Sequence, residues 1–404
     1  MAEDLIGRDG ADGPAVMVQP SLFDLFRAFF RVGLTSFGMA ILQNLRAMSL
    51  RRGFVSEAEI EEGIALVQLY PGPIMVDLVA FIGYRRRGAW GAIFAVAGFL
   101  LPATALMLAL AEAYRRYGNL PQVAAMLPGL TALVIGVVLS VTLDITRKNI
   151  ACRQDVLLAL FAFAIGVLGG NMLWAVAAGI AIGAAGWRHE PDQAVAEATT
   201  ALSWRRLATP LLLGVGLLAI ALVLAFRPGT LSDLALAFMK IGSIAFGNGA
   251  TILPIMQQVV VDQYHWLDGP QFAAAIALGQ ITPGPILNSA TFVGYQVAGL
   301  AGALAATAAI FAPSVVMTMV FTELFVHVRH LAPIRAGIRG VMAAFVGMLA
   351  WVAISMSQPL ADKPAAWLLV AAAVAALRIL KWDTIRLFAA GLVLWAAALQ
   401  FGLA

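Results

Sequence analysis

The tripeptide Pro-Gly-Pro occurs twice in this sequence, each time inside an apolar stretch. We call Pro71, Gly72 and Pro73 the first break, and Pro283, Gly284 and Pro285 the second break. Proline lacks a backbone N–H and glycine tolerates positive φ, so a helix must stop at each tripeptide. A helix that restarts there presents unpaired N–H groups and the positive end of its dipole. This arrangement favours an anion-binding site.

Side chains near the breaks could complete such a site. Asp77 follows the first break by four residues, and its counterpart after the second break is near Asn288 or Ser289. Neutral donors can hold an oxyanion without trapping it, and Gly-rich segments add flexible backbone. Beyond the two breaks, the candidate binding residues are Arg31, Phe37, Gly38, Gln68, Lys240, Gly247, Asn248, Gly249, Gln280, Thr282 and Asn288.

Three of the charged residues inside apolar stretches are functional candidates because burying a charge in a membrane is costly. Arg31 and Lys240 occupy equivalent places in the two halves and suit an anionic substrate, although each could instead snorkel to the interface. Asp77 has no charged counterpart. It could bind a coupling proton or gate the site, or it could pair with one of the two cations.

The composition is that of a polytopic membrane protein. Of 404 residues, 61% are hydrophobic and 12% charged, whereas a soluble domain has about 25% charged residues. The net charge of +4 comes from short basic loops and predicts topology, not nucleic-acid binding. The lone Cys152 forms no metal-ligand cluster, and no nucleophile–base pair occurs in the apolar segments. We therefore expect a transporter in the lipid bilayer, without cofactor, metal or catalytic residues.

The two halves are an internal repeat. Matching residues recur 209 to 212 positions apart, for example Gly33 with Gly242 and Tyr84 with Tyr295. We predict an all-α fold of two homologous repeats, each of about six helical elements with a broken Pro-Gly-Pro helix. The first broken element is expected to run from about Ala58 to Tyr84. The expected domains are a disordered cytoplasmic tail (1–20), a first repeat (21–187), a linker with one extra transmembrane helix (188–232) and a second repeat (233–404).

The extra helix between the repeats predicts that the second repeat is inverted. Six elements plus one make an odd number, and more basic loops fall on the side of the N-terminus. Positive-inside topology then places the N-terminus in the cytoplasm and the C-terminus outside. A re-entrant broken helix would change this count. Inverted repeats with broken helices near the midplane are typical of secondary transporters.

The sequence resembles the chromate ion transporter family in its tandem two-domain form. The motifs are Ser36-Phe37-Gly38, Gln68 with the first break, Phe246-Gly247-Asn248-Gly249, and Gly279-Gln280-Ile281-Thr282 with the second break. The resemblance implies export of chromate across the bacterial inner membrane and chromate resistance. The Gly-Pro-His that usually follows Phe-Gly in the first motif is missing here. Sulfate uptake or exchange and an anion channel therefore stay open as alternatives, as do proton coupling and a homodimer.

Overall fold

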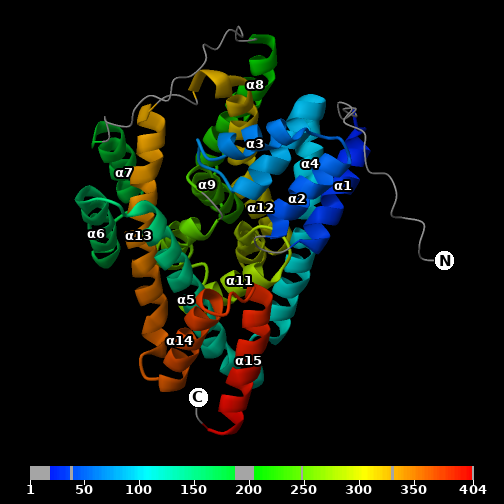
Figure 1. The fold of residues 1–404 in the computed structure, drawn as a ribbon. Helices are drawn as coiled ribbons and strands as arrows, with labels where there is room; N and C mark the ends of the chain where they lie inside the picture. The colour runs from blue at the N-terminus through cyan, green and yellow to red at the C-terminus, as the bar shows by residue number, and fades with distance from the viewer. Residues whose placement is uncertain (1–18, 37–39, 187–203, 247–248, 329–331, 403–404) are drawn as a thin grey trace, which may run out of the picture.

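A computed structural model of the chain describes residues 19–36, 40–186, 204–246, 249–328 and 332–402, and regular structure in this part is helical (Figure 1). The first repeat holds α1 (Leu22–Thr35), α2 (Ala40–Arg51), α3 (Glu57–Leu66), α4 (Ile74–Tyr117), α5 (Pro121–Asn149), α6 (Arg153–Val167) and α7 (Leu173–Gly186). Helix α8 (Trp204–Ala225) connects the repeats. The second repeat holds α9 (Thr230–Ser243), η1 (Ala250–Ile252), α10 (Leu253–Gln257), the π-helical η2 (Gln258–Gln263), α11 (Gly269–Ile281), η3 (Ile286–Asn288), α12 (Ser289–Val328), α13 (Ala332–Ser357), η4 (Gln358–Leu360), α14 (Pro364–Arg378) and α15 (Thr384–Gln400).

Helices α4 and α12 are both folded into hairpins at the same place in the repeat. The backbone leaves the helical region at residues 87–88 and 298–299, where Gly88 and Gly299 have φ of 61° and 59°. Each long helix therefore has a first limb (74–86 or 289–297) and a second limb (89–117 or 300–328). The limbs cross closely, because a Cβ added at Gly83 or Gly294 would collide with the carbonyl of Gly91 or Gly302.

The first break lies at the tip of a re-entrant hairpin. A capping box of Ser56 with Glu59 starts α3, and the first limb of α4 returns to the same end. There Arg86 pairs with Glu59, and Arg85 pairs with Glu62 at 3.1 Å. Of the two paths that the sequence leaves open for the element from about Ala58 to Tyr84, the structure therefore has the re-entrant one. The start of α3 and the end of the first limb of α4 lie at the same end of the hairpin, where Glu59 and Glu62 pair with Arg86 and Arg85.

Five helices in the described part of the chain are long and apolar enough to cross a membrane, namely α4, α5, α8, α12 and α13. The segment before the first broken element forms two short helices, α1 and α2. Two crossings per repeat plus α8 give three crossings from one repeat to the next. An odd number inverts the second repeat, so the inversion follows from a different count than the sequence predicts.

Contacts between the repeats agree with this inversion. Tyr84, close to the turn of α4, donates to Glu323 near the end of α12 at 3.0 Å. Tyr295, close to the turn of α12, donates to Glu112 near the end of α4 at 2.5 Å. The second limbs of α4 and α12 consequently run antiparallel. Helix α1 also begins in the upper part of the molecule, and α15 ends at its lower end (Figure 1).

Each repeat places its last two helices against the other repeat. Helices α6 and α7 pack along α13, where the rings of Phe163 and Trp351 meet edge to face at 6.3 Å. Helices α14 and α15 pack along α5, where Trp395 donates to the carbonyl of Ala125 at 2.9 Å and Arg378 pairs with Asp144 at 3.0 Å. This exchange joins the two repeats into one body.

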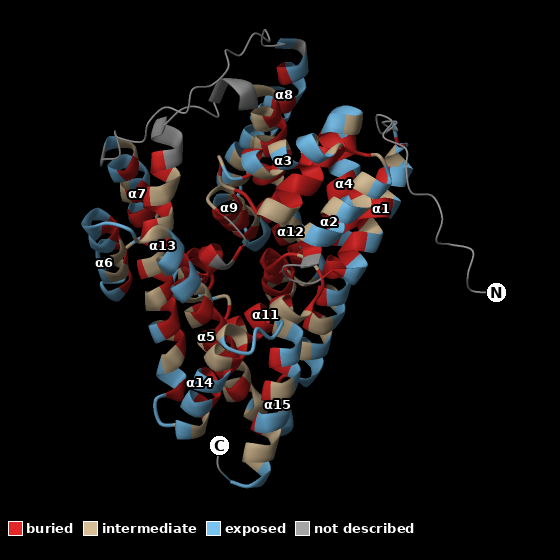
Figure 2. Ribbon diagram, viewed as in Figure 1, coloured by how far each residue is buried: buried red, intermediate tan, exposed pale blue. Residues whose placement is uncertain are grey.

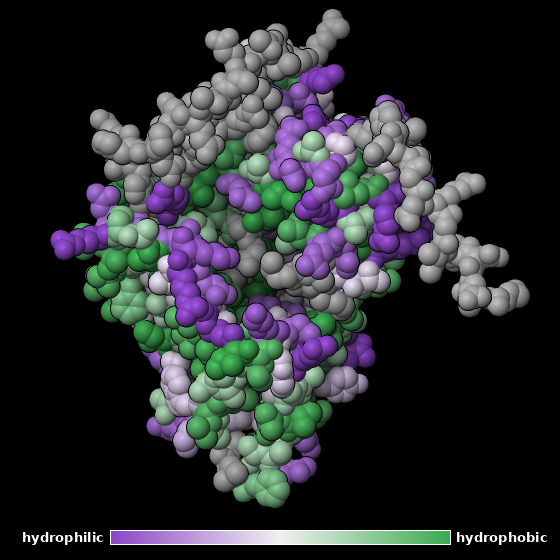
Figure 3. All heavy atoms as spheres, in the orientation of Figure 1, coloured by the Kyte–Doolittle hydropathy of each residue, from purple (hydrophilic) through white to green (hydrophobic). Residues whose placement is uncertain are grey.

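The buried residues gather on the inner faces of α4, α11 and α12, whereas α6, α14 and α15 carry exposed outer faces (Figure 2). Hydrophobic side chains cover much of the lower surface, and hydrophilic side chains gather over α2 and α3 (Figure 3). Many large apolar side chains point outward, for example Leu212, Leu218 and Trp174. Such exposure is stable only against lipid, so the protein is a multi-pass membrane protein.

Candidate functional site

The second break touches the first repeat directly. Gly284 has φ of 97°, a conformation that glycine adopts readily, and its N–H donates to the carbonyl of Ser36 at 3.3 Å. Ser36 is the last described residue of the first motif and is fully buried. Behind the break, η3 and α12 restart the helix in the protein interior. Backbone breaks inside a membrane need such protein partners.

Asp77 is the buried charge of the first break. Its side chain is 0% exposed, and neither carboxylate oxygen has a well-formed hydrogen bond. Its polar neighbours, Ser314 and Thr318, belong to the second limb of α12. Their hydroxyls donate to backbone carbonyls within α12. Thr318 also accepts a hydrogen bond from Tyr70 at 2.8 Å.

Asn288 takes the equivalent position at the second break, 211 residues after Asp77. It too is 0% exposed, and it faces the second limb of α4. Its Oδ1 accepts from Thr104 at 3.2 Å and from Thr291 at 3.0 Å, while its Nδ2 has no partner. At the first break the carboxyl group of Asp77 therefore faces Thr318 of the second repeat, and at the second break the amide of Asn288 faces Thr104 of the first repeat.

These groups form two buried clusters between the repeats, which we together call the polar seam. One holds Tyr70, Asp77, Ser314 and Thr318 at the first break, and the other holds Thr104 and Asn288 at the second break. The seam is buried in apolar surroundings, where an unpaired polar group costs about 1–3 kcal/mol. The unused N–H bonds of Asn288 can donate to an anion, and the carboxylate of Asp77 can take up a proton. The chemistry available is reversible binding of a small polar ion.

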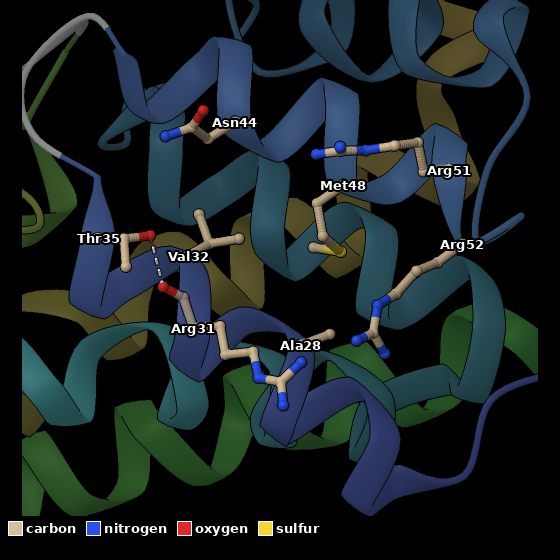
Figure 4. A pocket seen from close by; sticks show the side chains of 8 residues that line it. All are labelled: Ala28, Arg31, Val32, Thr35, Asn44, Met48, Arg51 and Arg52. Carbon is tan, nitrogen blue, oxygen red and sulfur yellow. Dashed lines mark hydrogen bonds between the residues drawn. The ribbon is translucent and has the colours of Figure 1, made fainter. Parts of the chain in front are cut away.

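The two predicted cations lie away from the breaks, in surface pockets. Arg31 lines a pocket of about 360 Å³ that we call the arginine pocket (Figure 4). Lys240 lines a pocket of about 250 Å³ that we call the lysine pocket. The arginine pocket is lined by Ala28, Arg31, Val32, Thr35, Asn44, Met48, Arg51 and Arg52. The lysine pocket is lined by Gly169, Asn171, Leu173, Lys240, Ile255, Gln258, Val259, Asp262 and Gln263.

The other predicted residues divide by burial. Thr282 is buried and donates to the carbonyl of Gly279 at 3.3 Å, and Gly249 is buried with φ of 87°. Gln280 is half-buried, whereas Gln68 is exposed and does not join the buried seam. Phe37, Gly38, Gly247 and Asn248 lie outside the described residues, as do the tail up to residue 18 and linker residues 187–203.

The partners that the opposite repeat supplies were not predicted from the sequence. Thr104, Ser314, Thr318 and Tyr70 lie on α4, on α12 or just before the first break. Ser314, Thr318 and Thr322 recur every four residues and so share one face of α12. These three hydroxyl residues on one face of an otherwise apolar helix could have predicted that this face of α12 contacts polar groups.

The comparison with protein families identifies the family of this chain. The family model described as "Chromate transporter" matches residues 23–184 and again residues 232–398. The chain belongs to the chromate transporter family. It is therefore a multi-pass protein of the bacterial inner membrane in a transporter family, and its two matched segments are the tandem repeats.

Individual members of the chromate transporter family cover most of this chain. It is 32% identical over 356 residues to the chromate transport protein of Cupriavidus metallidurans, covering 86% of each chain. It is 31% identical over 340 residues to an uncharacterized transporter of Methanocaldococcus jannaschii, covering 83% of this chain and 84% of the relative. It is 28% identical over 377 residues to a probable chromate transport protein of Synechococcus elongatus, covering 85% and 87%. No solved structure matches.

Proposed function

We propose that this protein exports chromate, a tetrahedral oxyanion, across the cytoplasmic membrane and thereby confers chromate resistance. The observation that carries the proposal is the buried polar seam, where both breaks meet the opposite repeat. Support also comes from relatives named as chromate transport proteins. Antiparallel repeats around one seam can expose it alternately to either side, as secondary transport requires.

The membrane potential is sufficient to drive export of a dianion. With the cell interior negative, each charge gains about 2.3 kcal/mol per 100 mV, so two charges gain about 4.6 kcal/mol. Binding must then be strong enough to select the ion and weak enough to release it. Neutral donors such as Asn288 and Thr282, with helix N-termini at the breaks, meet that requirement better than a fixed salt bridge would.

We assign different roles to the two breaks. The second break, with Gln280, Thr282, Asn288 and the Gly247–Gly249 segment, binds the oxyanion. The first break, with Asp77, gates the site or couples transport to a proton. The difference rests on the side chains at equivalent positions, an amide with free N–H bonds in one and a carboxylic acid in the other. An oxyanion is attracted by the amide and repelled by an ionised carboxylate.

The test is flux into proteoliposomes at a set membrane potential, with chromate, sulfate and molybdate offered separately. We expect saturable chromate flux, with sulfate competing because it has the same shape and charge. Gly284→Leu should abolish flux, because a leucine cannot adopt the φ of 97° without strain and would press on Ala103. Gly402→Leu, at a positive-φ glycine far from the seam with open space around it, is the matched control.

The variant Lys240→Ala tests whether Lys240 binds the oxyanion. If Lys240 binds the oxyanion, this variant should raise KM about tenfold or more with little change in kcat. Normal transport by both Lys240→Ala and Gly284→Leu would refute the proposed site. Sulfate flux without chromate flux would reassign the substrate, and single-channel currents would replace the carrier by a channel.

A further inference from the structure

The arginine and lysine pockets occupy the same position in the two repeats. Arg31 and Lys240 are 209 residues apart, on α1 and α9. On the facing wall, four positions are matched at an offset of 211. The matched pairs are Asn44 with Ile255, Met48 with Val259, Arg51 with Asp262, and Arg52 with Gln263. The repeat therefore builds one kind of pocket twice.

The two pockets differ in charge. The arginine pocket has three guanidinium groups and no carboxylate among its lining residues (Figure 4). The lysine pocket has one ammonium group and one carboxylate, Asp262. One wall position thus changes from Arg51 to Asp262, which reverses its charge. The first pocket attracts anions, and the second is close to neutral.

The neighbours of the three arginines do not cancel their charge. Arg51 donates to the carbonyl of Ala47 at 3.1 Å, and Arg52 lies 5.9 Å from the centre of the Phe54 ring. Among the described residues, Asp24 interacts with Arg52 electrostatically, and the pKa of Asp24 is lowered mainly by hydrogen bonds from Ser21. Asp24 belongs to the capping box of α1, where its Oδ2 accepts hydrogen bonds from the backbone N–H and the hydroxyl of Ser21. A net positive pocket is left.

The arginine pocket is connected to the second break by hydrogen bonds. Asn44, which lines the pocket, donates from Nδ2 to the Ser36 hydroxyl at 2.8 Å. The carbonyl of Ser36 accepts from the N–H of Gly284 at 3.3 Å. Two hydrogen bonds therefore separate the pocket wall from the break. An anion held by the arginines is therefore separated from the second break by the side chain of Asn44 and the residue Ser36.

We infer that the arginine pocket is a capture site for oxyanions on the N-terminal side of the membrane, and that the lysine pocket is its weakly binding counterpart on the opposite side. The inference rests on the proposed function and adds a direction to it. Clustered charge of one sign raises the local concentration of an oppositely charged substrate by about 10- to 1,000-fold. Release on the far side needs weaker binding, which the Lys240–Asp262 combination provides.

The test compares transport from the two sides. In inside-out vesicles, where the N-terminal side faces the medium, Arg31→Gln/Arg51→Gln/Arg52→Gln should raise KM for chromate about tenfold or more while kcat stays within about twofold. From the opposite side, in right-side-out vesicles, KM should not change. The matched control is Arg147→Gln/Lys148→Gln/Arg153→Gln, which removes the same charge from exposed positions and should leave KM unchanged.

Two further arms make the outcome decisive. Replacing the three arginines by lysine keeps the charge and should restore KM to within about threefold, which a folding defect would not allow. Vesicles with and without phosphatidylglycerol distinguish a free oxyanion from the phosphate of a lipid headgroup. A KM effect that appears only with the anionic lipid would assign the pocket to lipid and overturn the inference. Unchanged KM in active triple variants would overturn it too, whereas wild-type protein that moves no oxyanion would refute the proposed function itself.

Discussion

A single pair of residues distinguishes the two breaks. Asp77 and Asn288 are repeat-equivalent, fully buried and set against the opposite repeat, yet only one of them can ionise. A buried carboxylate without a partner is costly when it is charged, so a proton can change the state of this break. Asn288 keeps its dipole at every pH. The asymmetry therefore gives one break a response to protons that the other lacks.

Asp77→Asn should uncouple transport from protons without unfolding the protein, because asparagine has nearly the same shape and is neutral. A proton gradient imposed at zero potential should change the wild-type chromate flux at least about twofold and leave that of the variant unchanged. Flux driven by potential at equal pH serves as the control and should persist in both proteins. An equal response of both proteins to the gradient would exclude Asp77 as the coupling residue.

The hydrogen bonds of Tyr84 to Glu323 and of Tyr295 to Glu112 hold the two long hairpins together. Removing either hydroxyl should lower stability by about 1–3 kcal/mol, the usual range for a hydrogen bond to a charged group. Tyr84→Phe and Tyr295→Phe should therefore each lower the midpoint of thermal unfolding in detergent, and the double variant should lower it further. Unchanged midpoints would show that these contacts do not stabilise the assembly.

At the scale of elements, glycines have two separate tasks in the hairpins of α4 and α12. Gly88 and Gly299 turn the chain, which requires positive φ. Gly83 and Gly294 allow the limbs to cross, which requires the absence of a side chain. Both tasks recur at an offset of 211 residues, so the hairpin is the conserved unit of the repeat's geometry within this chain.

Substitutions distinguish these two tasks. Gly83→Leu should prevent close crossing of the limbs and abolish folded protein, because its side chain would meet backbone atoms of Gly91. Gly88→Ala has open space around the added carbon, but φ of 61° with ψ of −152° is a conformation almost confined to glycine, so it should cost about 1–3 kcal/mol of backbone strain. Size-exclusion profiles of fluorescent fusions measure both. A monodisperse Gly83→Leu variant would contradict the assigned packing.

Much of the element pattern follows from the sequence alone. The order of Gly, Pro and Tyr residues predicts two repeats, and Pro-Gly-Pro predicts where helices stop. The re-entrant path did not follow, because the apolar segment around Tyr70 is also compatible with a crossing. The pairing of Arg85 and Arg86 with the glutamates of α3 decides it. The seam could not be predicted either, since Asp77 meets Ser314 only after the repeats dock.

At the scale of the whole molecule, inversion and exchange make the two repeats interdependent. Helices α6 and α7 pack on α13, and helices α14 and α15 pack on α5, so neither repeat has its own complete core. A change of shape in one repeat must therefore be accompanied by a change in the other. Such coupling is what alternating access requires, and it gives the protein two related faces toward the two sides of the membrane.

The inversion predicts that equivalent turns face opposite sides. In a Cys152→Ser background, Gly88→Cys should react with a membrane-impermeant maleimide only in inside-out vesicles, and Gly299→Cys only in intact cells. Both positions have open space for a side chain, so the pair is matched. Labelling of both cysteines from the same side would contradict the inverted arrangement.

Flux of chromate in proteoliposomes at a controlled membrane potential tests the central claim most directly. The account predicts saturable movement of chromate toward the positive side, accelerated exchange when unlabelled chromate is present on the far side, and loss of both in Gly284→Leu. Absence of chromate movement at any potential, or stepwise single-channel currents in place of saturable exchange, would contradict an oxyanion carrier built on the two breaks.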